Sequence, residues 1–220
     1  MQGELKKVLL QIFKAHVTVI ASGRTDAGVH ASGQVVNFKV VTRMTTEEIR
    51  RALNALLPPD IAVMDVQEVD LQFHAILDVK SKTYRYTILH RDYPSALQRN
   101  RCHFYWHALD VSRMKEEAKA LVGKKDFKSF EASDPVRRKH STVRTVKKVL
   151  IRKQGPWITI DIEADGFLYK MVRNIVGTLL EAGSGKLPKG GIRQILRRKD
   201  RTKAGVTAVA QGLCLLEVTY

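Results

Sequence analysis

The chain has 220 residues, enough to bury a substantial core in one or two domains without a metal or disulfide. Its 38 lysines and arginines exceed its 22 aspartates and glutamates by 16 charges, which favours a polyanionic partner, nucleic acid first, over a basic surface kept only for solubility. There is no lipidation signal and no apolar run long enough to cross a bilayer, and Cys102 and Cys214 lack the spacing of a zinc site or a disulfide framework, so we expect a cytoplasmic protein that binds no membrane.

The first third of the chain is predicted to alternate helices and strands. Apolar residues at i, i+3, i+4, i+7 and i+8 predict a helix over residues 5–13. Two β-branched runs, 16–22 and 34–40, are typical of short buried strands. Thr45 and Glu48 form a capping box for a second helix, which two prolines end. A further strand is expected over residues 61–69.

The loop between the two predicted strands carries the candidate chemistry. Residues 23–31 read GRTDAGVHA, with one carboxylate, Asp26, and with Arg24 two positions before it. In an extended backbone both side chains point to the same side, so Arg24 can lie beside Asp26 or beside an anion that Asp26 attacks. The ordinary pKa of aspartic acid, roughly 3.9, makes Asp26 a nucleophile or base rather than a general acid. The alternative is a structural Asx turn.

All nine residues of this loop resemble the catalytic loop of the tRNA pseudouridine synthase A family. In that family the aspartate of the GRTD motif is essential. The resemblance therefore implies that Asp26 is the nucleophile, and it leaves open attack on C1′ or C6 of the uridine or a glycal route. Arg24 is suited to a phosphate contact.

A second resemblance lies in the strand predicted over residues 82–89, which begins KTYRY. Its alternation places Tyr84 and Tyr86 on one face. Two tyrosines on one strand face are usually core, but in a basic protein they also suit base stacking. In the family, the first tyrosine of this strand stacks on the target uracil, which maps to Tyr84.

The remaining elements are predicted from periodicity and turn signals. They are an aromatic core cluster over 102–106, a helix over 110–121, a hairpin of strands 146–151 and 157–163, a helix over 167–180, a short basic helix over 192–200 and a closing strand over 212–218. The glycine-rich loop 183–191 lacks the ending of a P-loop, so no nucleotide cofactor is expected. The basic stretch 134–148 is the candidate phosphate-contact surface.

Arg173 falls outside the centre of the apolar stripe of the helix over 167–180, so it faces either solvent or a cleft. Residues 171–177, MVRNIVG, resemble a further family signature, whose arginine pairs with the catalytic aspartate. The family also places a leucine of the closing strand against the reacting base. That leucine maps to Leu213, although the pattern alone predicts a core residue.

These matches run from residue 23 to 216 and imply an α+β fold of two similar subdomains, residues 1–78 and 79–220. Their joined, mostly antiparallel sheets would be flanked by helices around a central basic cleft. The family is homodimeric and converts uridine to pseudouridine in the anticodon stem-loop of tRNA, with no cofactor and no metal.

Two other interpretations remain open. The family's first strand, which precedes the first helix, is absent here, which suggests a catalytically impaired tRNA-binding protein. A hydrolase or a metal nuclease using Asp26 and His30 would need further acidic ligands that the loop does not supply.

Overall fold

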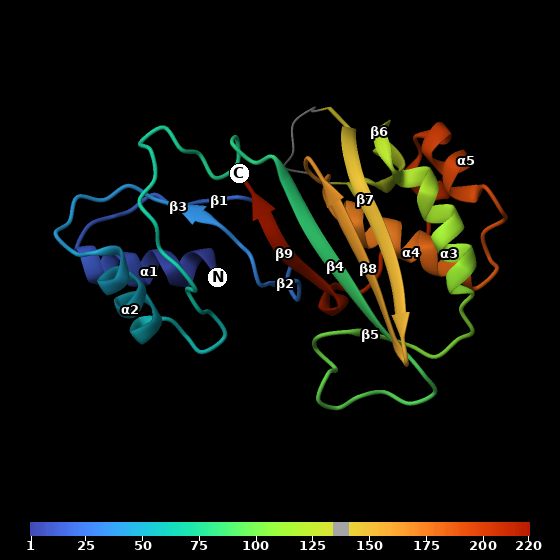
Figure 1. Cartoon of the computed structure of the whole chain (residues 1–220), viewed down its shortest axis with the longest axis horizontal. Coiled ribbons are helices and arrows are strands. Elements are labelled where there is room, and N and C mark those ends of the chain that lie inside the picture. The colour runs from blue at the N-terminus through green and yellow to red at the C-terminus, as the bar shows by residue number, and fades with distance from the viewer. Residues whose placement is uncertain (134–140) are drawn as a thin grey trace. The chain divides into compact units, whose positions relative to one another are not determined.

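The computed structural model describes residues 1–133 and 141–220, which form two compact units. The first unit contains residues 1–23 and 35–78, and the second contains residues 24–34 and 79–220 (Figure 1). The loop that carries Asp26 therefore belongs to the second unit. Seven residues of the predicted phosphate-contact stretch, residues 134–140, lie outside the described part of the chain.

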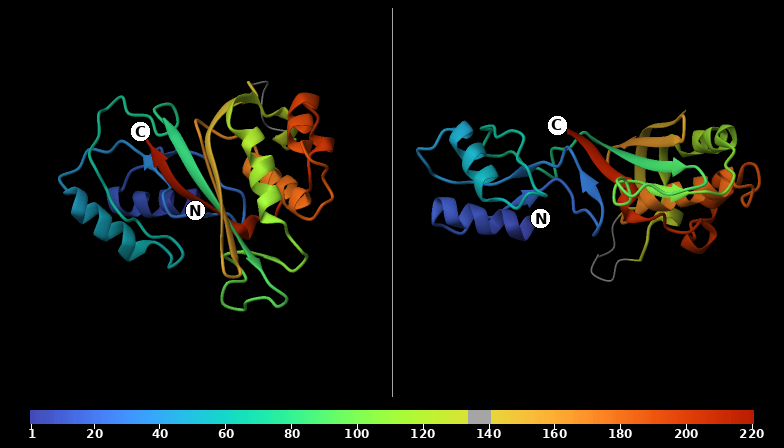
Figure 2. Two further views of the ribbon diagram at one scale, coloured as in Figure 1. Left: turned by 45° about the vertical axis from the view of Figure 1, so that its right-hand side comes forward. Right: turned by 90° about the horizontal axis from the view of Figure 1, so that it is seen from below.

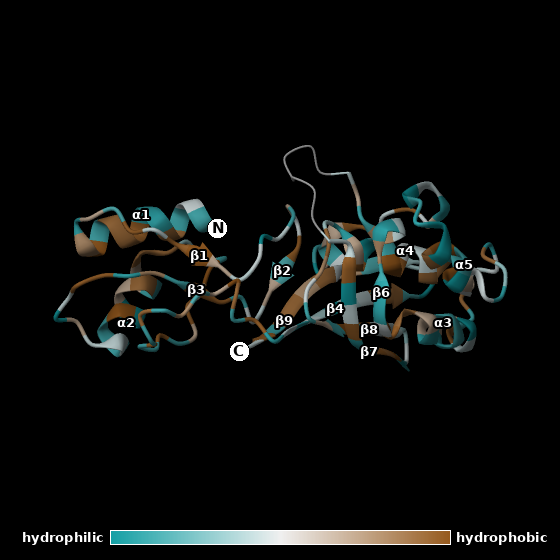
Figure 3. Cartoon of the chain, turned by 90° about the horizontal axis from the view of Figure 1, so that it is seen from above, coloured by the Kyte–Doolittle hydropathy of each residue, from teal (hydrophilic) through white to brown (hydrophobic). Residues whose placement is uncertain are grey.

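The first unit packs two helices with a short two-stranded sheet. Helix α1 spans Gln2–Phe13 and α2 spans Thr46–Leu56, and strands β1 (Ile20–Ala21) and β3 (Val36–Asn37) pair antiparallel. Figure 3 shows hydrophilic and hydrophobic residues alternating along α1, as expected of an amphipathic helix. The core of this unit contains Val8, Leu9, Val19, Ile49, Leu53 and Leu57. The capping box of α2 is confirmed, since Thr45 accepts from the Glu48 backbone and Glu48 accepts from that of Thr45.

The strands of this unit are shorter than predicted. The prediction of a strand over residues 61–69 is wrong, because that segment forms no strand. Val63 lies in the middle of that segment. Its N–H donates to the Asn54 side chain at 2.7 Å, and its carbonyl accepts from the same amide at 2.8 Å. Because the Asn54 side chain binds both the N–H and the carbonyl of Val63, these groups are not free to pair with a neighbouring strand.

The second unit is built on a seven-stranded sheet of order β2-β9-β4-β8-β7-β6, with β5 paired beside β4 (Figures 1 and 2). The pairs β2·β9 and β4·β5 are parallel, and the others are antiparallel. The strands are β2 (His30–Ala31), β4 (Ser81–His90), β5 (His103–Tyr105), β6 (Gly123–Asp126), β7 (Val143–Gln154), β8 (Trp157–Ala164) and β9 (Leu213–Thr219). The predicted hairpin is thus confirmed as β7 and β8.

Three helices accompany this sheet: α3 (Val111–Ala118), α4 (Met171–Gly183) and α5 (Gly191–Arg198). Short 3-10 helices are η1 (Lys119–Leu121), η2 (Lys128–Phe130), η3 (Arg201–Lys203) and η4 (Ala210–Gly212). Alternate residues of β8 are fully buried in one core with the apolar stripe of α4. The α+β class, with mostly antiparallel sheets flanked by helices, is therefore confirmed. Among the described residues, no helix has the length and apolar content to cross a membrane.

Two further features differ from those predicted. Helix α4 begins at Met171 rather than at residue 167, because the Lys170 backbone is left-handed, with φ of 57°. The aromatic cluster is only partly core: Cys102 is buried, but Trp106 is 64% exposed and stacks on the His107 ring at 3.9 Å between centroids. Trp106 stands one residue beyond β5, where no neighbouring strand covers it in the described chain.

Candidate active site

The loop before β2 forms a tight turn that carries Asp26. The Val29 N–H donates to the Asp26 carbonyl at 3.0 Å, and Gly28 has φ of 81°, which favours glycine. A Cβ on Gly28 would lie 3.3 Å from the Cβ of Ala210. The loop then enters β2, which pairs in parallel with β9. Strand β9 and the segment before it therefore fix the position of the turn.

Asp26 forms an ion pair with Arg173 in the first turn of α4. Arg173 Nη1 donates to Asp26 Oδ2 at 2.6 Å, and the two side chains are 14% and 23% exposed. Such charge-assisted hydrogen bonds are about twice as strong as neutral ones. Only Oδ2 has a partner among the described residues, so Oδ1 is the oxygen left for a substrate.

The Arg173 guanidinium is itself held by the backbone of an irregular segment, residues 205–209. Arg173 Nε donates to the Ala208 carbonyl at 2.7 Å, and the Ala208 N–H donates to the Arg173 carbonyl at 3.1 Å. The fork of Arg173 thus bridges Asp26 and Ala208. Its orientation depends on where residues 205–209 lie.

Helix α4 holds residues 205–209 along their length. The Thr207 hydroxyl donates to Asn174 Oδ1 at 2.7 Å, and the Gly205 N–H donates to the Thr178 hydroxyl at 2.9 Å. A side chain at Gly177 would overlap the carbonyl of Val206, so glycine lets the segment lie directly on the helix. The described contacts explain two features of the MVRNIVG motif: the asparagine binds the segment and the glycine admits it.

Tyr86 fixes the far end of this segment. Its fully buried hydroxyl donates to the Val209 carbonyl at 2.9 Å and lies 3.1 Å from His103 Nδ1. Burial raises the pKa of Tyr86, although the positive charge of Arg173 opposes that shift. Burial also lowers the pKa of His103. Alternation along the strand predicts only the face of the sheet on which Tyr86 lies, so the sequence pattern did not reveal this hydrogen bond.

Tyr84 lies on the same strand, half-buried, with its ring edge-to-face against Phe167 at 5.1 Å and 89°. Burial raises its pKa to about 12, and the negative charge of Asp26 adds to that shift, ahead of Cys214. The Tyr84 phenol is therefore neutral at physiological pH and within electrostatic range of Asp26. Phe167 was predicted to begin the following helix, and its contact with Tyr84 was not predicted.

The other two predicted site residues occupy different surroundings. Leu213 is 6% exposed, belongs to the core and lies opposite Tyr86 in the β4·β9 register. Arg24 is exposed and forms no ion pair with any described residue, so Arg173, not Arg24, is the partner of Asp26. The structure brings together Asp26, Arg173 and Tyr84, with Leu213 in the adjoining core.

An oriented carboxylate with one oxygen open, held by a guanidinium beside a neutral tyrosine, makes this a candidate site for carboxylate-dependent catalysis on an α+β scaffold. The strong positive charge of the chain fits an anionic substrate.

Comparison with known proteins identifies the family. The family model described as tRNA pseudouridine synthase matches residues 2–78 and 118–220. The chain is 44% identical over 219 residues to tRNA pseudouridine synthase A of Thermoanaerobacter sp. (strain X514), covering 100% of this chain and 89% of that protein. It is 42% identical over 226 residues to tRNA pseudouridine synthase A of Pectobacterium atrosepticum, covering 100% and 77%. The chain belongs to the tRNA pseudouridine synthase family, and the resemblance seen in its motifs is confirmed.

Proposed function

We propose that this protein isomerises uridine to pseudouridine in tRNA, with Asp26 as the nucleophile. The observation that carries the proposal is the Asp26–Arg173 ion pair beside Tyr84, formed by three of the motifs that resemble the family. Family membership supplies the reaction and the substrate class.

The reaction breaks the N1–C1′ bond of uridine and joins C1′ to C5 of the same base, so its atoms balance without a cofactor. Asp26 attacks C1′ or C6, or removes a proton from the sugar in the glycal route. In each route the Asp26 carboxylate must be ionised and aimed. Arg173 orients the Asp26 carboxylate, because it binds Oδ2 and leaves Oδ1 free.

Tyr84 is proposed to stack on the target uracil. Taking a base out of its stack costs a few kcal/mol, and stacking on an aromatic ring returns roughly 1–3 kcal/mol. Leu213 is proposed to lie against the reacting base. Arg24, exposed on the same turn as Asp26, is proposed to bind a phosphate of the flipped nucleotide.

The finer assignments follow the family resemblance. We propose that the target uridines lie in the anticodon stem-loop, that the protein is a cytoplasmic homodimer, that RNA lies in a basic cleft, and that the subdomains divide after residue 78.

The test of this proposal is the substitution Asp26→Asn, with Asp92→Asn as the control because Asp92 is exposed. An unmodified tRNA transcript is incubated with each protein, and pseudouridine is mapped along the RNA. Asp26→Asn should form no pseudouridine while binding tRNA with nearly unchanged affinity, and Asp92→Asn should match the wild type. Turnover by Asp26→Asn would remove Asp26 as the nucleophile. If the wild-type protein binds tRNA and forms no pseudouridine, the impaired-enzyme interpretation replaces this one.

A further inference from the structure

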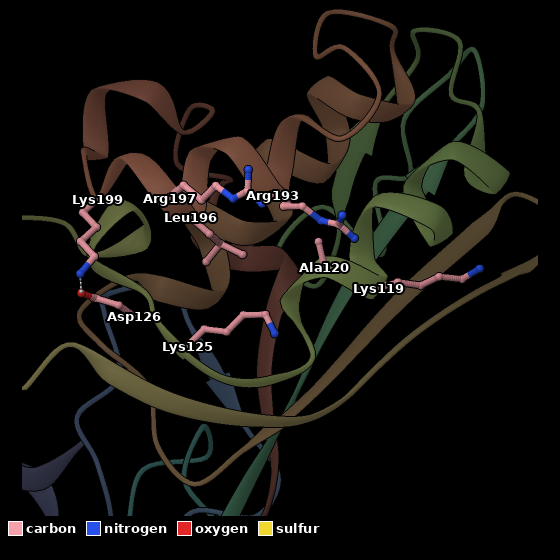
Figure 4. Close-up of a pocket in the computed structure, with 8 residues that line it drawn as sticks. All are labelled: Lys119, Ala120, Lys125, Asp126, Arg193, Leu196, Arg197 and Lys199. Carbon is pink, nitrogen blue, oxygen red and sulfur yellow. Dashed lines mark ion pairs between the residues drawn. The ribbon is translucent and has the colours of Figure 1, made fainter.

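A basic groove lies among α5, η1 and β6 of the second unit (Figure 4). It encloses about 470 Å³. The cationic residues Lys119, Lys125, Arg193, Arg197 and Lys199 line it, together with Leu196. None of them belongs to the catalytic set described above. Figure 4 shows the two arginines reaching out from α5 and Lys125 reaching up from β6.

Local acids neutralise only part of this charge. Lys199 pairs with Asp126 at 3.0 Å, and Lys119 pairs with Glu116 at 2.8 Å. Burial raises the pKa of Asp126, but hydrogen bonds from Thr142 and Lys199 outweigh burial and lower it, so Asp126 is ionised. Among the described residues, no ion pair involves the two arginines or Lys125. The groove therefore keeps a net positive charge.

The placement of Arg193 costs α5 stability, whereas Arg197 lies in the last turn, where a cation is favourable. Arg193 and Arg197 are four residues apart on one helix face, where like charges repel. Arg193 also lies in the first turn, at the positive end of the helix dipole, where a cation is unfavourable. A bound anion would reverse both effects.

The groove is separate from the catalytic set. Strand β2, which follows Asp26, ends one edge of the sheet path, and β6, which carries Lys125, ends the other. Asp26 itself pairs with Arg173 of α4, and the next residue, Asn174, accepts a hydrogen bond from Arg201, two residues after Lys199. An RNA that fills the active site would have to extend past α4 and η3 to reach the groove.

We propose that this groove binds the phosphodiester backbone of the RNA substrate, outside the segment that enters the active site; the proposal rests on the proposed function. Arginine suits the role, because its planar fork matches phosphate oxygens and can bind two of them at once. Such contacts position an RNA without reading its sequence. The groove is thus a docking site for a part of tRNA that does not react.

The test removes two charges from the groove with the double substitution Arg193→Gln and Arg197→Gln. Lys115→Gln with Lys186→Gln is the matched control, because it removes equal charge from exposed positions near the same helices that line no part of the groove. Both groove arginines are exposed, so folding should be retained. The Kd for a full-length unmodified tRNA transcript is measured from about 50 to 200 mM salt, since each phosphate contact contributes about 0.7–0.9 to the salt slope.

The groove variant should bind tRNA about tenfold more weakly at the low-salt end, and its salt slope should fall by roughly 1.5. The control should stay within about twofold of the wild type. The proposal is overturned if the groove variant binds like the wild type, or if the control loses affinity equally. Because binding is measured without turnover, a wild type that binds tRNA but forms no pseudouridine counts against the proposed function and not against the groove.

Discussion

Arg173 is the residue on which the geometry of the candidate site depends. Its guanidinium joins the Asp26 carboxylate at 2.6 Å to the Ala208 carbonyl at 2.7 Å. Both members of the ion pair are mostly removed from solvent, so loss of either would leave a partly buried charge without its partner. A lysine at position 173 would keep the charge but could not keep both directed contacts.

The pKa of Tyr84, which burial raises to about 12, predicts how the stability of the protein depends on pH. The folded state favours the neutral phenol, so its contribution to stability is complete below the ordinary pKa near 10 and is lost as the pH rises toward 12. Between those values the wild type should lose about 2 kcal/mol more unfolding free energy than Tyr84→Phe, which has no phenol to ionise. Urea unfolding of both proteins at the two ends of this range measures the difference, and equal losses would contradict it.

At the scale of elements, residues 205–209 couple α4 to β4. Helix α4 holds the segment through Asn174 and Thr178, and Tyr86 of β4 holds its end at Val209. Arg173 lies between these supports and takes its orientation from Ala208. The candidate site therefore depends on a segment that contributes only backbone atoms to it.

This coupling predicts that Tyr86→Phe lowers the kcat for tRNA by several-fold to tenfold and leaves KM unchanged. The lost hydroxyl frees the Val209 carbonyl, so the segment that orients Arg173 can shift, whereas the tRNA contacts remain. The unsatisfied carbonyl should also lower the unfolding free energy by about 1–3 kcal/mol. Steady-state kinetics and urea unfolding measure the two effects.

Ser129→Ala is the control for this substitution, since it removes another buried hydroxyl that donates to a carbonyl, that of Ile195, in the same unit. It should lose comparable stability and keep its kcat. If both variants keep the wild-type kcat, Tyr86 has no positioning role.

The sequence predicted the helices and the long strands well, because their signals are local. The capping box at Thr45 and the alternation along β8 depend on neighbouring residues alone. The strand over residues 61–69 failed because pairing depends on a partner, and Asn54 took the backbone groups of Val63 instead. Tyr86 was missed as a hydrogen-bond donor for a similar reason: its acceptor, Val209, lies 123 residues away.

The candidate site was also predictable only where its signals are local. Periodicity placed Arg173 off the apolar stripe, but it could not name Asp26 as the partner, 147 residues away. The family resemblance supplied that pairing. The groove of α5 was not found, because the cations that line it come from segments between residues 119 and 199 that only the fold brings together.

At the scale of the whole molecule, the excess of 16 positive charges acts on stability as well as on binding. Like charges repel one another in the folded state, and a polyanion relieves that repulsion. Because tRNA binds the folded protein, it should also stabilise that protein by mass action, by about 2.7 kcal/mol at a free concentration 100 times Kd.

For a chain of this size, that stabilisation corresponds to a rise in Tm of about 5–10 °C. Asp26→Asn should show the same rise, because it removes a site carboxylate and none of the positive charge. Thermal unfolding with and without a tRNA transcript measures the shift at fixed ionic strength. If tRNA raises the Tm of the wild type alone, then Asp26 contributes to binding the RNA as well as to its chemistry, and the separation of charge-driven binding from carboxylate-driven catalysis fails.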